Sequence, residues 1–304
     1  MVRIHRAVTR PAAGQFVASP YPARSFESRG LTGALAAVLW SSITMSALIA
    51  VNFTLPAPVR AQSMVDSLDL TSDEFTKADM SHADVEGALA KLKDGETLDL
   101  SGKRLNGLDL SGMDLTRTRL QAARINNAKF KDAKLDGVVL DAAWAIKSDF
   151  TNASFIGASL FQTQMLNAKI DGANFAHAMV GADMSRASVT NANFDNAILA
   201  PDLTNQSMGL MRGVLMSADL KGATFKGANL RRSVLEFADL RGADFEGADL
   251  TGAELAGADL TGANIAGANL EDADVDSAKL VDLKGADSAK GMDKLKNADK
   301  AIRN

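Results

Sequence analysis

Residues 238–270 read ADLRGADFEGADLTGAELAGADLTGANIAGANL, and a large apolar residue recurs at every fifth position. A period of five fits neither common element. Successive apolar residues would spread around the whole surface of an α-helix, and they would alternate between the two faces of a flat strand. Alanine usually lies two positions before each large residue, and residues two apart in extended backbone point the same way. We therefore expect both residues to face a central axis, with a corner between successive units.

Four corners of about 90° would close a square coil of about twenty residues, and each coil would stack on the next at about 4.8 Å. The register of large residues runs from Leu100 to Val180, shifts by one residue at Met184, and resumes from Leu215 to Leu280. Residues about twenty apart should therefore stack. This stacking predicts a structural core ladder of phenylalanines in three runs: Phe130 with Phe150, Phe155 with Phe175 and then Phe194, and Phe225 with Phe245.

The repeated units ADLxG, with the variants GADFE, GANLR and GANIA, resemble the pentapeptide-repeat proteins. The resemblance covers residues 96–282, about 37 units, and is strongest over residues 218–280. It implies an all-β solenoid, a right-handed quadrilateral β-helix of about nine coils. Glycine often follows the large residue by two positions, as at Gly242 and Gly247. There we expect a tight corner whose backbone angle is costly for other residues.

The segments that flank the repeats are expected to cover the open ends of the coil stack. Residues 81–95, SHADVEGALAKLKDG, begin with a capping box from Ser81 to Asp84 and predict an N-terminal capping helix. Residues 283–304 have apolar residues at near-helical spacing and predict a second short helical cap. Residues 62–80 are interpreted as a flexible acidic linker. Within the repeat region, residues 200–214 match poorly and contain Pro201, which predicts a loop or bulge.

The first 61 residues have the composition of an export signal. Residues 1–30 carry five arginines and a single acidic residue, Glu27, and residues 31–55 carry no charge. Small residues then lead to a candidate cleavage site after Ala61. We expect a periplasmic or secreted protein. The alternative is an uncleaved signal anchor that holds the protein in the inner membrane through residues 31–55, which are long enough to span a bilayer.

Composition and patterning argue against an enzyme. The 304-residue chain has no cysteine and only three widely separated histidines, so we expect neither a metal site nor a cofactor. The aspartates of the repeats face outward, and no nucleophile or base accompanies them. The formal charge of −4 becomes −9 without residues 1–61, since 27 basic and 36 acidic residues remain. An acidic protein of this kind is not expected to bind nucleic acid directly.

A few apolar residues occupy positions where most units have polar residues. Candidates for a partner-binding surface are Trp144, Ile146, Phe161 and Phe237, together with Met208 and Met211 of the irregular stretch. The alternative interpretation is ordinary scatter of exposed apolar residues and drift of the repeat.

Three functions follow from the sequence. The preferred one is a non-enzymatic exported bacterial scaffold, or interaction rod, that binds a protein partner not identified by the sequence. The family resemblance implies a second, a DNA-mimicking topoisomerase inhibitor. The third is a membrane-anchored organiser of an envelope complex. End-to-end pairing of two copies is a further prediction if a cap is displaced.

Overall fold

The computed structural model describes residues 4–6, 69–201 and 211–304. Apart from Ile4–Arg6, the expected export signal and the segment 31–55 lie outside the described residues. The helices and strands are β1 (Ile4–Arg6), α1 (Asp73–Thr76), α2 (His82–Ala90), β2 (Glu96–Asp99), β3 (Thr118–Arg119) and the 3-10 helix η2 (Ala286–Ser288). Among the described residues, no helix has the length and apolar character that crossing a bilayer requires.

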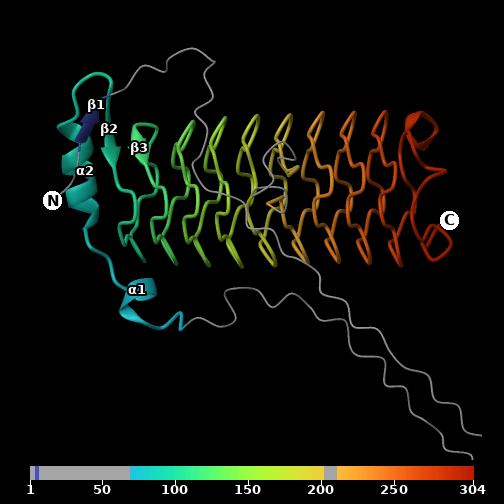
Figure 1. The fold of residues 1–304 in the computed structure, drawn as a ribbon, viewed down its shortest axis with the longest axis horizontal. Helices are drawn as coiled ribbons and strands as arrows, with labels where there is room; N and C mark the ends of the chain where they lie inside the picture. Colours follow the sequence, from blue (N-terminus) through green and yellow to red (C-terminus); the bar gives the residue numbers. More distant parts are fainter. Residues whose placement is uncertain (1–3, 7–68, 202–210) are drawn as a thin grey trace, which may run out of the picture. The chain divides into compact units, whose positions relative to one another are not determined.

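β2 lies between β1, which is antiparallel to it, and β3, which is parallel. From Arg104 onward the chain forms successive coils joined by isolated parallel bridges (Figure 1). Each coil contributes four bridges, for example at Arg104, Asp109, Asp114 and Arg119. Long strands do not form here because each five-residue unit contains a corner and leaves only a short extended stretch.

The spacing between bridged residues follows the register of the repeats. Arg104 pairs with Arg124, twenty residues further on. The spacing falls to nineteen where Gln164 pairs with Asp183, rises to thirty-one where Asp183 pairs with Val214, and then returns to twenty. The one-residue shift at Met184 and the irregular stretch after Leu199 therefore change the length of single coils, while the parallel pairing continues past both.

One unit illustrates how the backbone is satisfied. The Phe130 amide donates to the Asp149 carbonyl of the next coil at 2.7 Å, and the Asp132 amide donates to Thr151 at 2.9 Å. The Ala133 amide closes the corner on the Phe130 carbonyl at 3.0 Å. Asp132 has a φ of 57°, so the corner has the positive angle of the third residue of a type II turn.

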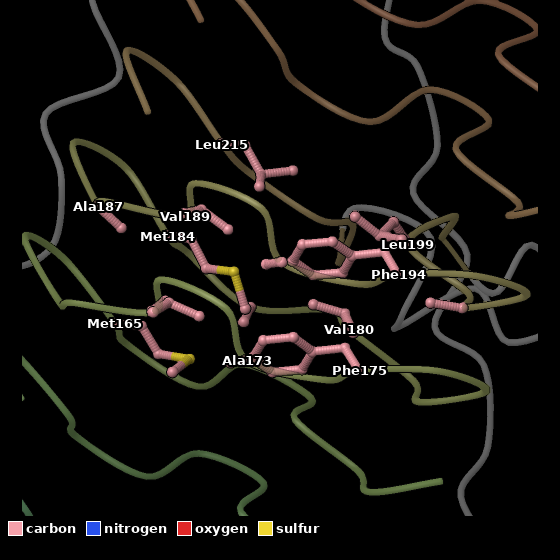
Figure 2. Packing of buried hydrophobic residues seen from close by; sticks show 14 of the residues in the cluster. Met165, Ala173, Phe175, Val180, Met184, Ala187, Val189, Phe194, Leu199 and Leu215 are labelled. Carbon is pink, nitrogen blue, oxygen red and sulfur yellow. The ribbon is translucent and has the colours of Figure 1, made fainter. Parts of the chain in front are cut away.

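The core is a narrow column of alanines and large apolar side chains, nearly all fully buried. Five phenylalanines form a continuous stack within it: Phe155, Phe175, Phe194, Phe225 and Phe245. Their successive ring centroids lie 4.6, 4.8, 5.0 and 5.0 Å apart with nearly parallel planes. Figure 2 shows Phe175 and Phe194 facing each other within this column. The stack passes from Phe194 to Phe225 across the irregular stretch, so the interruption leaves this part of the core continuous.

Phe130 and Phe150 form a second stack on a neighbouring side of the coil, with ring centroids 5.0 Å apart. Phe150 also meets Phe155 edge to face at 5.3 Å, which joins the two stacks. The twenty-residue period predicts the Phe130 and Phe150 pair. The edge contact arises from packing across a corner, which the period does not describe.

At the N-terminal end, α2 packs against the core. Ser81 and Asp84 form the capping box: the Ser81 amide donates to the Asp84 carboxylate at 2.8 Å, and the Asp84 amide donates to the Ser81 hydroxyl at 3.2 Å. Val85 is fully buried in the core cluster, and Leu89 and Leu92 pack partly buried against it. The helix therefore shields apolar surface of the first coils.

The C-terminal segment differs from the expected helix. Over residues 283–304 only η2 is helical, and parallel bridges continue as far as Ile302. Gly285 and Gly291 explain the difference. Both have positive φ, and an added Cβ would lie 2.5 Å from an Ala266 atom or 2.4 Å from the Glu271 backbone. These glycines break a helix and bring the backbone close to the preceding coil.

Candidate interaction surfaces

Residues 69–79, which we call the strap, contain α1 and lie against the outer side of the first coils. This differs from the expected flexible linker for this part of residues 62–80. The Phe75 side chain is 7% exposed, and its ring meets Trp144 edge to face with centroids 5.3 Å apart. The guanidinium carbon of Arg124 lies 5.9 Å from the Phe75 centroid, and Arg124 also pairs with the Glu74 carboxylate. The Phe75 ring and the Glu74 carboxylate therefore hold the polar strap against the coils.

The C-terminal end of the strap pairs with the edge of a coil. Ala78 forms an antiparallel bridge with Leu105, and the Asp79 amide donates to the Arg104 carbonyl at 2.7 Å. The Asp79 carboxylate accepts from the Arg104 guanidinium at 2.6 and 2.9 Å and from the Arg104 amide at 2.9 Å. These hydrogen bonds hold the pKa of Asp79 below its ordinary value.

A buried asparagine joins the strap to the coils. The Asn106 side-chain amide donates to the carbonyls of Glu74 and Lys77, at 3.1 and 2.8 Å. Its side-chain oxygen accepts from the backbone and side-chain amides of Asn126, each at 3.0 Å. The coil fixes the orientation of Asn106, and Asn106 in turn satisfies carbonyls at the end of α1 that the short helix leaves unpaired.

A hollow of about 80 Å³ lies between the strap and the coils. It is lined by Leu70, Phe75, Asn126, Asn127, Ile146 and Lys147. Ligand pockets for small molecules usually measure about 300–1,000 Å³. This hollow is therefore a packing gap under the strap and too small for a substrate.

The second surface lies where the coil register breaks. The corner after Val180 consists of a single residue, Gly181. One coil later, the corresponding corner is interrupted between Leu199 and Gly213. The Gly213 amide donates to the Leu199 carbonyl at 2.7 Å, which brings the two ends of the excursion together. We call this region, with its flanking side chains Phe161, Gln162, Met179, Ile198 and Met211, the interrupted corner.

Apolar side chains are exposed beside the interrupted corner. Met179 and Ile198 form a bridge on adjacent coils and are 53% and 48% exposed. Phe161 lies against Gly181, since a Cβ there would lie 3.3 Å from its ring. The Gln162 side-chain amide contacts the Met211 sulfur at 2.6 Å. Met179 and Ile198 are therefore neighbours on the surface. Each occupies the position just before the large buried residue of its unit, where most repeats have a polar residue.

The structure separates the residues predicted for partner binding. Trp144 is half-buried beneath the strap, and Ile146 is only 5% exposed. Phe161 and Met211 belong to the interrupted corner. Phe237 is 58% exposed on its own and lies over Gly257 in a later coil. Met208 lies outside the described residues.

Sequence reasoning missed two sets of residues. Met179 and Ile198 were detectable, because each replaces the polar residue that directly precedes the centre of a unit. Phe75 and Asp79 gave no such signal, since the strap lies outside the repeats and its contacts are with residues distant in sequence.

The outward aspartates have a local structural function. Asp149, for example, accepts from the backbone amide and hydroxyl of Thr151, two residues later, at 3.0 and 2.6 Å. At Asp114 the same contacts with Thr116 lower the pKa of the carboxyl group. Among the described residues, no three His, Cys, Asp or Glu side chains are grouped closely enough to hold a metal ion. These carboxylates stabilise corners.

Comparison with known proteins agrees with the repeat pattern. A family model described as pentapeptide repeats matches in eight copies, over residues 104–141, 133–165, 148–180, 215–252 and 243–282. HetL of the cyanobacterium Nostoc sp. strain PCC 7120, a pentapeptide repeat protein involved in heterocyst differentiation regulation, is similar in structure. Its TM-score is 0.53 at 25% identity, and the match covers 73% of this chain and 94% of HetL.

QnrB1, a plasmid-mediated fluoroquinolone resistance protein, shares the fold with a TM-score of 0.50 at 17% identity, over 64% of this chain and 91% of QnrB1. Among curated proteins, no sequence matches this chain. The parallel ladders and the two structural matches define a right-handed β-helix solenoid. The chain belongs to the pentapeptide-repeat proteins, which are generally non-enzymatic structural or interaction proteins. The family matches stop at residue 180 and resume at 215, on either side of the excursion at the interrupted corner.

Proposed function

We propose that this protein is a non-enzymatic interaction rod that binds an apolar segment of a partner protein at the interrupted corner. The observation that carries the proposal is the pair Met179 and Ile198, exposed side by side where the repeat breaks. Apolar side chains exposed singly are common and need no explanation, whereas neighbouring ones on a polar surface favour protein binding.

The rigidity of the β-helix supports the same proposal. Val180 and Leu199, the centres that follow Met179 and Ile198, are fully buried and held by inter-coil hydrogen bonds. A side chain fixed on such a backbone loses little conformational freedom when a partner covers it. The corner therefore presents its apolar groups in a fixed arrangement.

Affinity capture tests this site. We expect the Met179→Asp, Ile198→Asp double variant to lose a partner that the wild-type protein retains after crosslinking in envelope extracts. Ile156→Asp is the matched control, since Ile156 is an exposed apolar residue, 41% accessible, at a different corner. Equal recovery of the partner by wild type and both variants would contradict the site.

We propose export as part of this function, supported by the arginine-rich and uncharged segments of residues 1–61. Cell fractionation with mass spectrometry of the N-terminus tests it. A soluble periplasmic form that begins at Gln62 supports export. An uncut form in the membrane fraction favours the membrane-anchored organiser instead.

The fold shared with QnrB1 keeps topoisomerase inhibition by DNA mimicry as an alternative. The charge arrangement favours the interaction rod. Asp219, Asp239 and Asp259 stack on one side of the later coils, but Lys221 lies 2.8 and 3.1 Å from the first two, and Lys279 lies 3.0 Å from the third. A mimic of DNA needs a continuous negative surface. Inhibition of DNA supercoiling by the purified protein at micromolar concentration would favour the alternative.

We propose a rod of about nine coils, closed by α2 at one end and by the segment around η2 at the other. The buried Val85 and the 9% exposure of Leu295 support this assignment of the ends. Ile302, which is 51% exposed and forms the last bridge with Lys279, is the apolar residue on which end-to-end pairing of two copies would depend. Light scattering of wild type and Ile302→Glu tests that pairing.

A further inference from the structure

The strap covers a surface with the components of a peptide-binding site. Arg104 and Arg124 are bridged to each other, and Arg124 is bridged to Trp144, so two cations and an aromatic ring follow one another along three coils. The strap brings Asp79 to the first, Glu74 to the second and Phe75 to the third. Each side chain on the coils therefore has a complementary group on the strap.

Main-chain contacts add recognition that does not depend on side chains. The antiparallel bridge between Ala78 and Leu105 adds the strap to an open edge of a coil, as in the binding of extended peptides by strand addition. The Asn106 side-chain amide donates to two backbone carbonyls of the strap, those of Glu74 and Lys77. A segment of another protein that adopts the same backbone, one helical turn followed by an extended residue, fits these contacts.

The strap is also separable from the core. Phe75 packs outside the continuous core cluster, whose first member is Val85. α1 has only four residues, and so short a helix has little stability of its own. Loss of the strap therefore leaves the stacked coils and their hydrogen bonds in place.

We propose that the surface formed by Arg104, Asn106, Arg124 and Trp144 is a peptide-binding site that the strap occupies as a tethered ligand. The external ligand is an acidic segment of a partner protein with the spacing Glu-Phe-x-x-x-Asp, as in residues 74–79, which binds with a helical turn at Glu-Phe and extended backbone before Asp. Binding requires displacement of the strap. This site goes beyond the proposed function, because it lies on different coils from the interrupted corner and takes an acidic rather than a purely apolar partner.

A labelled peptide with the sequence of residues 69–80, DLTSDEFTKADM, tests the proposal against the full-length chain. A tethered segment competes at an effective concentration of about millimolar, so wild type should bind the peptide weakly. The strap variant Glu74→Gln, Phe75→Ala should bind it at least about tenfold more tightly. Adding Trp144→Ala to the strap variant should abolish binding, whereas adding Phe237→Ala, on a distant coil, should not.

Two results would overturn the proposal. One is equally weak binding of the peptide by wild type and by a strap variant that keeps the wild-type circular dichroism spectrum. The other is independent of any variant and uses hydrogen exchange in the wild-type protein. The Asp79 amide, bonded to Arg104, should exchange at least about tenfold faster than the Asp149 amide, bonded to Ala128 within the coils. Equal protection of the two amides would show that the strap does not open.

Discussion

The coils of residues 120–199 and those of residues 215–280 have the same corner geometry but different residues at it. In the later coils eight glycines occupy the last corner position, with φ between 62° and 70°. In the earlier coils the same position holds mostly other residues, such as Asn127, Lys147 and His177, with φ between 54° and 59°. The backbone angle is thus set by the stacking of coils and their hydrogen bonds, whichever residue is present.

The earlier and later coils differ in the backbone strain at their corners. A positive φ costs most residues about 1–2 kcal/mol, and it costs asparagine and aspartate less because their side chains hydrogen-bond locally. The earlier coils use these residues often, as at Asn152 and Asn167. Among the described residues, no β-branched side chain occupies a position of positive φ. The later coils meet this requirement mostly with glycine, whereas the earlier coils use asparagine or aspartate at some corners and more strained residues, such as Lys147, at others.

The largest expected effect tests whether the two regions share one core. Phe175→Ala and Phe225→Ala should each lower the free energy of unfolding by about 3–5 kcal/mol, because each ring is fully buried and stacked on both sides. Denaturant unfolding followed by circular dichroism measures both. A loss of less than about 1 kcal/mol in one region would show that its coils pack differently.

The next effect isolates the corner strain. An added Cβ at Gly247 meets no atom within 4 Å, so any cost there comes from the backbone angle. Gly247→Val should destabilise by about 1–3 kcal/mol and Gly247→Asn by less than about 1 kcal/mol. In the earlier coils, Asn167→Val should cost as much as Gly247→Val, and Asn167→Gly should be nearly neutral. Equal thermal midpoints for Gly247→Val and Gly247→Asn would refute this account.

An acid titration tests an ion-pair cluster found in the later coils. The Arg241 and Lys221 side chains lower the pKa of Asp239 from 3.8 to about 2. Because the folded pKa is depressed, this contribution is complete above about pH 4 and is lost as the pH falls toward 2. We expect a loss of about 1–2 kcal/mol, allowing for partial exposure. Asp239→Asn should remove this part of the pH dependence, and an unchanged acid slope would contradict it.

The smallest effect is expected at Phe237, the exposed aromatic residue at a corner with φ of 57°. Phe237→Gly removes the contact of the ring with Gly257 and relieves the positive φ. These changes oppose each other, so the free energy of unfolding should change by less than about 0.5 kcal/mol. A loss of more than 1 kcal/mol in thermal unfolding would show that this ring stabilises its coils.

Sequence reasoning succeeded where a pattern repeats and failed where contacts are made once. The period of five predicts that Phe155 stacks on Phe175, because four units make a coil of twenty residues and this spacing is the same in most coils. It did not place Phe225 on Phe194, since an excursion separates them by thirty-one residues and only the ladder shows that the stack resumes. The interrupted corner was visible as an irregular stretch. Met179 and Ile198 were each detectable as an apolar residue at a polar position, and the bridge between them makes them neighbours on adjacent coils.

The five-residue alternation of small, polar, large and corner residues predicts the β-helix without a structure, because stacked square coils bury its apolar side chains and an α-helix or a flat strand would not. The sequence by itself also shows where the repeat breaks. The segment that covers the sides of the coils is identified only in the folded molecule. The Phe75 ring packs on Trp144, and the Asp79 carboxylate pairs with Arg104, although these residues are far apart in the chain. Such contacts depend on the positions of whole coils, which no local pattern of residues encodes.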